Sequence, residues 1–405
     1  MKGRRKANLP KSVVLLIETS NSFSRGILNG IRKWMKQHEP WDVYLMEQGR
    51  GEQPPLWLNQ WKGDGIIARI ENPSIETAVR RTKSCVINVS AANLAPEFPV
   101  VRSDSAALAQ VAALHFIERG LQNFGYCGDP RRIWAQEHGE HFVSLVTKRG
   151  FRCQSFEISP EELLRYKKAD RRLLTWLKSL PKPAGVFVGY DIRGQQVLSA
   201  CRAGGIRVPE EISVVSQHND ETLCELCNPP LSSVIPDSHQ IGLLAASLLN
   251  DQMNGRKVPA VEYLVPPVGI QVRRSSDTLA FDDPQVAAAM RFMQTHACEC
   301  ISIDDVLNVV PICRTLLQRR FKSQTGRTPY EQIRHFRLQE ARKLLASTNM
   351  TIAEIALQTG FRTTEYFNAA FRKEEGLPPG QYRRKLNAAQ DQSVRLCQRF
   401  ETRSM

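Results

Sequence analysis

Apolar and polar residues follow two different patterns along the chain, and the change falls close to residue 272. From residue 13 to about 270, short β-rich apolar runs are separated by amphipathic stretches such as GILNGIRKWMKQH and AALAQVAALHFIERG. The strand-like runs read VVLLIE, DVYLME, GIIARI, CVINVS, FGYCGD, GVFVGYD, ISVVSQ and SSVIP. Strands that alternate with helices favour parallel sheets covered on both faces. So many strands predict an α/β fold with two doubly wound lobes, between which the chain crosses at Asp104 and at Pro236 and Asp237.

Beyond the polar stretch QVRRSSDTLAFDDPQ, short helical patterns replace the strand patterns up to about residue 386. We therefore expect an all-α domain after the α/β domain. The predicted organisation is a flexible basic N-terminus over 1–12, a two-lobed domain over 13–272, a linker over 273–290, the all-α domain over 291–386 and a disordered tail over 387–405.

Residues 351–371, TIAEIALQTGFRTTEYFNAAF, contain two short helical patterns with an abrupt stop at Gly360. Glycine tolerates the positive φ at which helices commonly end, and Thr363 can cap the helix that follows. Two helices joined by a short glycine-containing turn are typical of a helix-turn-helix, whose second helix enters the DNA major groove. An ordinary αα-hairpin would give the same local pattern.

An earlier stretch, 302–326, repeats this arrangement, with a second helix that starts near Cys313. We expect its exposed side to carry Arg314, Thr315, Gln318, Arg319, Arg320 and Lys322. Arginine and glutamine bond base edges, and basic side chains neutralise phosphates. Between the two copies, a helix of about 19 residues starting at Pro329 would span roughly 28 Å. This length is close to the ~34 Å of one DNA turn, so the two copies predict a pair of linked DNA-reading units.

The charge balance supports a polyanionic partner, because the chain has 55 Lys and Arg against 41 Asp and Glu. No apolar run approaches the ~18 residues of a membrane span, and the basic start lacks the features of a signal peptide. We therefore expect a cytoplasmic protein with no membrane partner. The ten cysteines include a CxxC at Cys224 and Cys227 and a CxC at Cys298 and Cys300, but neither has a second pair at zinc-site spacing. We predict no metal site.

Residues 302–386 resemble an AraC-type DNA-binding domain. The residues that carry the resemblance in its second half are Ile355, Ala356, Gly360, Phe361, Tyr366, Phe367, Phe371, Gly376, Pro379, Tyr382 and Arg383, and those in its first half are Leu317, Arg319, Phe321 and Gly326. Two residues depart from it, since Pro311 replaces the usual glycine and Cys313 the usual capping serine. The predicted DNA-binding residues are Arg314, Thr315, Gln318, Arg319, Lys322, Thr363, Thr364, Glu365, Asn368 and Arg372.

Residues 13–270 resemble the sugar-sensing core of LacI-type regulators, which has a periplasmic-binding-protein fold. With the AraC-type domain placed after this core, the chain resembles the XylR-like xylose operon regulators over nearly its whole length, most closely at VPPVGIQVRRSSD, HACECISIDDVL and LLASTNMTIAEIA. This resemblance implies a homodimer that binds an operator in double-stranded DNA, works with RNA polymerase and activates pentose catabolic genes when D-xylose is bound. The sugar is an effector, and no cofactor is implied.

In such a core the sugar lies at the carboxyl ends of the strands, between polar side chains and aromatic rings. The candidates are Phe23, Arg25, Arg69, Asp104, Trp134, Glu137, Asp191, Arg193, His218 and Asn219, with Asp191 and Asn219 foremost. At S-Q-H-N, His218 stands where such sensors usually place an aspartate. This departure keeps a different sugar open as the ligand.

Three other functions remain open at this point. A repressor would use the same parts as an activator. An enzyme on the α/β core, tethered to DNA, is disfavoured because G-x-G-x-x-G, G-x-x-x-x-G-K-[ST] and G-x-S-x-G are absent from the sequence. A purely architectural DNA-binding protein would leave the two-lobed core unexplained. We therefore predict a ligand-responsive transcription regulator without catalytic residues.

Overall fold

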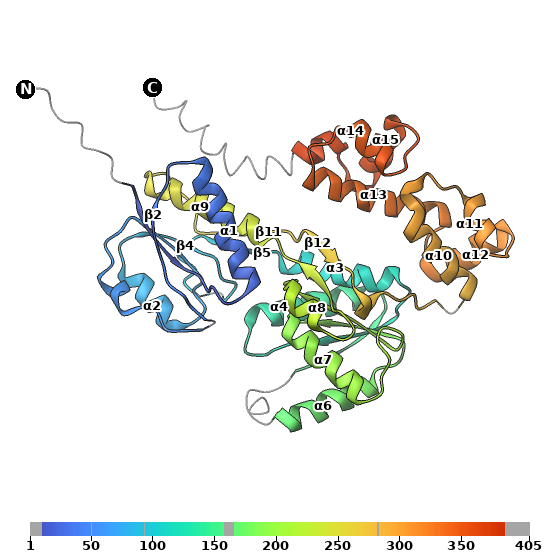
Figure 1. Ribbon diagram of the computed structural model, residues 1–405, viewed down its shortest axis with the longest axis horizontal. Helices are drawn as coiled ribbons and strands as arrows, with labels where there is room; N and C mark the ends of the chain where they lie inside the picture. Colours follow the sequence, from blue (N-terminus) through green and yellow to red (C-terminus); the bar gives the residue numbers. More distant parts are fainter. Residues whose placement is uncertain (1–9, 50, 93, 158–165, 282, 385–405) are drawn as a thin grey trace, which may run out of the picture. The chain divides into compact units, whose positions relative to one another are not determined.

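The computed structural model describes residues 10–49, 51–92, 94–157, 166–281 and 283–384 (Figure 1). The chain divides into two compact units, one made of 1–113 with 123–276 and the other of 114–122 with 277–405. The first unit contains two separate sheets, which we call lobe one and lobe two. The expected α/β class followed by an all-α region is confirmed.

Lobe one is a parallel sheet with two helices on one face and shorter helices on the other (Figure 1). Its strand order is β11 (Glu262–Val265), β5 (Val100–Ser103), β4 (Cys85–Asn88), β3 (Gly65–Ala68), β1 (Ser12–Leu16) and β2 (Asp42–Leu45). One apolar core joins the sheet to α1 (Ser22–Gln37) and α9 (Ser238–Met253), and another joins it to η1 (Leu56–Gln60) and α2 (Pro73–Arg81). Helices α1 and α9 approach closely at Gly30 and Gly242, where a Cβ would lie within 2.1 Å of a backbone oxygen of the other helix.

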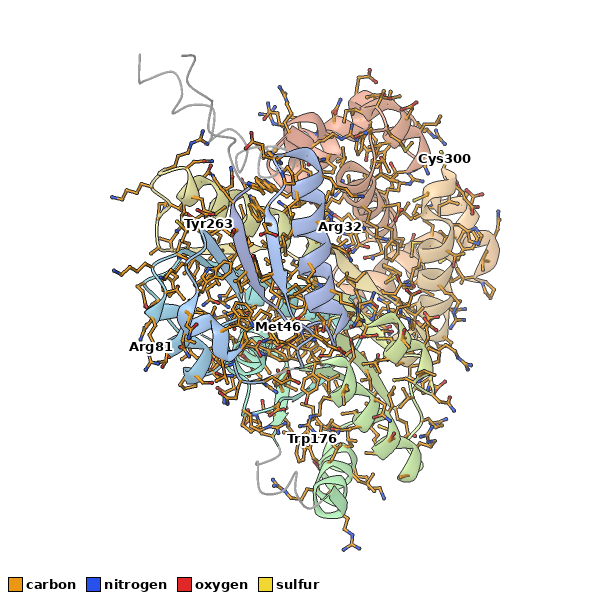
Figure 2. The ribbon with its side chains drawn as sticks, turned by 60° about the vertical axis from the view of Figure 1, so that its left-hand side comes forward. Arg32, Met46, Arg81, Trp176, Tyr263 and Cys300 are labelled. Carbon is orange, nitrogen blue, oxygen red and sulfur yellow. The ribbon has the colours of Figure 1, made fainter. Side chains whose placement is uncertain are left out.

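Lobe two has the same plan, with one antiparallel edge strand. Its order is β12 (Gly269–Gln271), β10 (Ser232–Ile235), β9 (Ile212–Gln217), β8 (Ala184–Val188), β6 (Asn123–Cys127) and β7 (Arg152–Phe156), and β12 is the antiparallel member. Its helices are α3 (Ser105–Glu118), α4 (Ile133–Lys148), α6 (Tyr166–Ser179), α7 (Asp191–Ala203) and α8 (Glu221–Leu226), with the short η2 (Arg274–Ser276) near the end. Trp176, labelled in Figure 2, lies on α6 and packs into the core that lines β6 and β8.

Each of the expected apolar runs contains a strand, and four further strands were not expected. Three of them, β7, β11 and β12, lie at sheet edges, where polar residues face solvent and weaken the apolar pattern, and the fourth, β5, lies next to β11. The chain passes from β5 of lobe one to lobe two after Asp104, and from β10 back to lobe one after Pro236 and Asp237. It crosses a third time between β11 and β12, because each of these short strands joins a different sheet.

The helical part of the second unit contains α10 (Pro284–His296), η3 (Ala297–Glu299), α11 (Ile303–Val309), α12 (Arg314–Thr325), α13 (Pro329–Ser347), α14 (Ile352–Gln358) and α15 (Thr364–Glu375). Two apolar cores form, one around α10 to α12 and one around α14 and α15, and α13 contributes side chains to both. Cys300, labelled in Figure 2, follows η3 in this unit and lies three residues before the start of α11.

Helix α10 begins at Pro284, within the predicted linker over 273–290. Asp283 caps the helix, accepting from the backbone nitrogens of Gln285 at 2.9 Å and Val286 at 3.4 Å, and proline occupies the first turn. Both the predicted tail over 387–405 and most of the predicted flexible start over 1–12 lie outside the described residues. No helix in the described ranges is long and apolar enough to cross a membrane.

Candidate functional site

Aromatic side chains from both lobes meet in the first unit. Phe23, at the start of α1 in lobe one, has its ring centroid 5.4 Å from that of His218, which follows β9 in lobe two. The centroid of Trp134, on α4, lies 5.3 Å from His218 on the lobe-two side. The guanidinium carbon of Arg69 lies 5.4 Å from the centroid of the Phe23 ring. Four predicted residues are thus in one cluster, and their rings offer apolar faces of the kind on which sugars stack.

A buried network in lobe one fixes Arg69. The carboxylate of Glu18, at the end of β1, accepts from Asn21 Nδ2 at 2.6 Å, Ser24 Oγ at 3.1 Å and Arg69 Nη1 at 3.0 Å. The other terminal nitrogen of Arg69 donates to Glu71. Because Glu18 and Arg69 are both almost fully buried, the network holds the guanidinium in one place against Phe23.

In lobe two, Gln217 and His138 form a buried pair. Gln217 Nε2 lies 2.6 Å from His138 Nδ1 and donates to the backbone oxygen of Gly189 at 2.6 Å. Burial, with smaller contributions from the charge of Arg102 and from His141, lowers the pKa of His138 to about 3. His138 is therefore neutral at physiological pH, and its Nδ1 can accept the hydrogen bond.

Asp191 lies beneath the loop that carries His218. Its carboxylate accepts from Ser216 Oγ at 2.5 Å, Ser233 Oγ at 2.9 Å and the backbone nitrogen of Asp220 at 2.8 Å. Burial raises the pKa of Asp191 to about 6, although these hydrogen bonds oppose the rise. The geometry gives Asp191 a positioning role for the loop, and direct contact with a ligand stays a prediction.

The loop itself is strained. His218 has φ 95° and Asn219 φ 49°, in the left-handed region that side chains other than glycine seldom adopt. The side-chain oxygen of Asn219 accepts from Arg273 Nη1 at 2.9 Å. Residues kept in such conformations cluster at ligand-binding loops, where the surrounding structure enforces them.

Several buried polar atoms in the two lobes that supply the cluster have no hydrogen-bond partner among the residues that the structure describes. They are Arg69 Nε and Glu71 Oε2 in lobe one and Arg193 Nε, Arg193 Nη2 and Gln217 Oε1 in lobe two. Arg193 is 1% exposed, and only its Nη1 is bonded in this structure, to Gln196 at 2.6 Å. Leaving such groups unpaired is costly, so they call for a ligand that both donates and accepts. A polyol does both with each hydroxyl group.

Three predicted residues make other contacts. Arg25 is exposed and donates to the backbone oxygen of Thr19 at 3.0 Å. Asp104 caps α3 by accepting from the backbone nitrogen of Ala107 at 3.0 Å. Glu137 accepts from Arg102 Nη1 at 2.7 Å. None of these contacts brings the side chain to the aromatic cluster, and their predicted contact with a ligand is untested.

Sequence reasoning missed the polar partners Glu18, Glu71, His138, Gln217 and Arg273. Glu18 and Gln217 stand at the ends of strand-like runs, so the rule that ligands lie at the carboxyl ends of strands would have found them. His138 lies four residues beyond Trp134, one helical turn along α4. Arg273 follows β12, after the last crossing between the lobes, and reaches Asn219 from there. No local sequence pattern predicts this contact.

The first helix-turn-helix consists of α11 and α12, and α12 exposes a basic face. Arg314, Thr315, Gln318, Arg319 and Lys322 are exposed, as expected. Arg320, also expected to be exposed, is instead half-buried, because it pairs with Asp283 at 3.0 Å across to the start of α10. Cys313 precedes α12 and makes no side-chain capping bond.

The second helix-turn-helix consists of α14 and α15. Gly360, with φ 77°, ends α14, and Thr363 caps α15 by accepting from the backbone nitrogen of Tyr366 at 3.2 Å. On this helix Thr363, Glu365 and Arg372 are exposed, whereas Thr364 and Asn368 are half-buried. Contact of these side chains with DNA stays a prediction.

Helix α13 fastens the two halves together. Arg337 donates to the backbone oxygens of Ala297 at 2.7 Å and Ile301 at 2.9 Å, ahead of the first helix-turn-helix. Arg342 pairs with Glu375 at 3.0 Å, at the end of the second. One 19-residue helix, α13, therefore connects the two helix-turn-helices, as the sequence predicts.

Three protein families match parts of the chain. Residues 12–104 match the XylR N-terminal domain, residues 113–276 a periplasmic binding protein-like domain, and residues 309–385 a helix-turn-helix domain. The first two cover the lobes that form the aromatic cluster, and the third covers α12 to α15.

Relatives match the chain over nearly its full length. It is 33% identical to the xylose operon regulatory protein of Escherichia coli (strain K12), over 92% of this chain and 96% of the relative. It is 30% identical to the protein of the same name from Haemophilus influenzae, over 92% of this chain and 97% of that one. A solved structure described as the xylose-binding transcription activator xylR is similar with a TM-score of 0.60 and 31% identity, covering 93% of this chain and 98% of that chain.

Proposed function

Because the chain belongs to the family of xylose operon regulatory proteins, we propose that it is a D-xylose-dependent activator of pentose catabolic genes. The family consists of transcription regulators and not of enzymes. In this proposal the protein acts in the cytoplasm as a homodimer, binds an operator through its helix-turn-helix units and works with RNA polymerase.

The observation that carries the proposal is the set of unpaired polar atoms beside the aromatic cluster. Arg69 and Glu71 supply a donor and an acceptor from lobe one, and Arg193 and Gln217 supply donors and an acceptor from lobe two. A pentose has hydroxyl groups around its ring and apolar C–H faces between them. It would satisfy these atoms and pack against Phe23, Trp134 or His218.

A sugar that bonds to both lobes stabilises the arrangement in which both sets of atoms reach it. It shifts DNA binding only if it binds that arrangement more tightly than the alternative. Each basic α12 then engages the major groove of one half-site, and a dimer presents two copies of the pair α12 and α15.

A sugar other than D-xylose is the second candidate ligand, and His218 is the observation that favours it. Where related sensors have a carboxylate, which only accepts, an imidazole both donates and accepts when neutral. A repressor with the same architecture would bind its sugar in the same way and differ only in the sign of regulation.

Calorimetric titration of the full chain with D-xylose, arabinose, ribose and glucose tests the proposal. We expect micromolar-to-millimolar binding of D-xylose. Arg193→Met should weaken it by about tenfold or more, because hydrogen bonds from a charged donor contribute about 1.5–3 kcal/mol. Arg80→Met, at an exposed arginine of α2 that pairs with Glu97 at 2.6 Å and belongs to no predicted site, should leave the affinity unchanged. Binding of another sugar alone would reassign the effector, and no heat with all four would contradict the proposal.

A further inference from the structure

Helix α3 begins in the first compact unit and ends in the second. Residues Ser105 to Ala113 belong to the first unit, and its last turn, Leu114 to Glu118, belongs to the unit that contains the helix-turn-helices. The 14 residues of the helix span about 21 Å. Its inner side is fully buried and apolar, through Leu108, Ala109, Ala112, Ala113 and Phe116. The helix is continuous from Ser105 to Glu118, so hydrogen-bonded backbone joins its two ends.

The first turn of α3 is held by charged groups in the first unit. Glu137 Oε2 accepts from Ser105 Oγ at 3.0 Å and from Arg102 Nη1 at 2.7 Å. Glu137 lies on α4, three residues after Trp134 of the aromatic cluster. Helix α4 therefore contributes to the aromatic cluster and also contacts the start of α3.

The last turn of α3 ends in a nearly buried carboxylate. Glu118 Oε1 lies 2.7 Å from His335 Nε2 on α13, and Gln339 Nε2 donates to Glu118 Oε2 at 3.2 Å. Arg327, just before α13, lies 3.8 Å from the same carboxylate. Burial alone would raise the pKa of Glu118, but the hydrogen bond and charge of His335, with the charge of Arg327, hold it below its ordinary value.

The turn after α3 is also fitted to the second unit. Gly120 has φ 82°, and a Cβ there would lie 2.7 Å from the ring of Phe281. The backbone nitrogen of Ala280 donates to the backbone oxygen of Arg119 at 2.8 Å. Phe281 packs against the apolar core around α10 to α12. The end of α3 is thus a structural part of the helical unit and more than a surface contact.

His335 extends the contact toward the second DNA-reading helix. Its Nδ1 lies 3.4 Å from Glu374 Oε1 near the end of α15, on the side opposite Glu118. The ring is 8% exposed. A change in the position of Glu118 therefore acts on α13 directly and on α15 through His335.

We infer that Glu118 is a positioning residue that fastens α3 to α13 and, through this contact, transmits the sugar-induced change to the DNA-reading helices. The inference rests on the proposed function for the sugar response, but the fastening itself does not. A buried carboxylate bonded by several donors has one well-defined position, and its loss would leave the donors unpaired. Movement of α3 by the sugar would then no longer be imposed on α13.

The test compares the full-length wild type with Glu118→Gln, which keeps the shape of the side chain and removes its charge. Glu340→Gln is the matched control, because it removes the same charge from α13 itself, where Glu340 forms an exposed pair with Lys343 at 2.9 Å. Glu374→Gln is a second variant at the outer end of the contact, where a smaller effect is expected. Two quantities are measured on each protein. The first is hydrogen exchange of residues 329–347 without sugar. The second is the ratio of affinities with and without D-xylose for a DNA duplex that the wild type selects from a random library.

We expect faster exchange over 329–347 in Glu118→Gln, with 12–103 unchanged, and a coupling ratio within about twofold of 1. The wild type and Glu340→Gln should keep a ratio of about fivefold or more. The affinity for D-xylose alone should not change in Glu118→Gln. Unchanged exchange together with an unchanged ratio would overturn the inference. A wild-type ratio of 1 would contradict the proposed sugar response, and the exchange measurement, which needs no sugar, would still decide whether Glu118 fastens α13.

Discussion

The two helix-turn-helix units begin alike and then differ at the turn. Both first helices start with a capping box, at Ser302 with Asp305 and at Thr351 with Glu354. The second helix-turn-helix then turns at Gly360, and Thr363 caps its DNA-reading helix. The first helix-turn-helix turns through Pro311, and its second helix, α12, follows Cys313 without a side-chain cap. Local backbone chemistry therefore specifies the second turn more strongly than the first.

The charges of the two DNA-reading helices favour the first helix-turn-helix, whereas the turn chemistry favours the second. Helix α12, RTLLQRRFKSQT, has four basic and no acidic residues, whereas α15, TEYFNAAFRKEE, has two basic and three acidic residues. Neutralising phosphates supplies much of the affinity for DNA. The half with the weaker turn therefore has the more basic second helix, so its turn and its charge can be varied separately.

The largest expected effect is on DNA affinity when base-reading groups of α12 are removed. Gln318→Ala with Arg319→Ala should weaken specific binding by about 100-fold or more, since each bidentate base contact contributes about 1–3 kcal/mol. Asn368→Ala with Arg372→Ala on α15 should weaken specific DNA binding by only about tenfold, because Asn368 is half-buried and α15 is less basic than α12. Fluorescence anisotropy with a selected duplex measures both. Equal losses from the two helices would remove the proposed asymmetry.

The next effect is on the stability of the second turn. In Gly360→Ala the new methyl group would lie 2.8 Å from the backbone oxygen of Cys298, at a residue with φ 77°. We expect the free energy of unfolding of the helical unit to fall by about 3 kcal/mol, from strain and from displaced backbone. Gly326→Ala is the control, because it has φ 74° and no described atom within 4 Å of its Cβ. It should cost about 1 kcal/mol. Urea unfolding gives both values, and similar losses would exclude a role for the close contact at Gly360.

A smaller effect is expected at the cap of α15. Thr363→Ala removes the acceptor for the backbone nitrogen of Tyr366 and should destabilise the helical unit by about 1 kcal/mol. Thr315→Ala, at an exposed position inside α12, should change stability by less than about 0.5 kcal/mol. Hydrogen exchange of the first turn of α15 would report the lost cap directly. Unchanged exchange there would show that Thr363 does not stabilise the helix.

The smallest effect is a gain at the uncapped helix. Cys313→Ser supplies an oxygen at a position with extended backbone, φ −74° and ψ 152°, from which serine can accept a backbone hydrogen bond. The helical unit should gain about 0.5–1 kcal/mol. Thermal unfolding measures it. A loss of stability would mean that the thiol of Cys313 stabilises the helical unit by more than a serine cap would add.

The sequence predicted the parts of the fold that have a strong local signal. Buried strands such as β8 and β3 are continuous apolar runs, and α13 begins at Pro329 as expected. The edge strand β7 was missed because its solvent-facing positions are polar, which weakens the apolar pattern. The start of α10 at Pro284 was not predicted, because Asp283 and Pro284 are also typical of a turn.

The candidate site was predictable in part for the same physical reason. Phe23, Arg69, Trp134 and His218 were chosen because they follow strand ends, and the structure brings them into one cluster. The positioning role of Asp191 could not be found, since Ser216 and Ser233 come from different strands that only the fold brings together. The ion pair of Arg320 was missed likewise, because its partner Asp283 lies 37 residues earlier.

We propose that a sugar bound between the two lobes controls how the helix-turn-helix units bind DNA. To test this, the affinity of the full chain for its selected duplex is measured at increasing concentrations of D-xylose, with glucose as the control sugar. We expect the DNA affinity to change by about fivefold or more, to saturate with D-xylose and not to respond to glucose. A DNA affinity that stays constant while calorimetry shows D-xylose bound would contradict it.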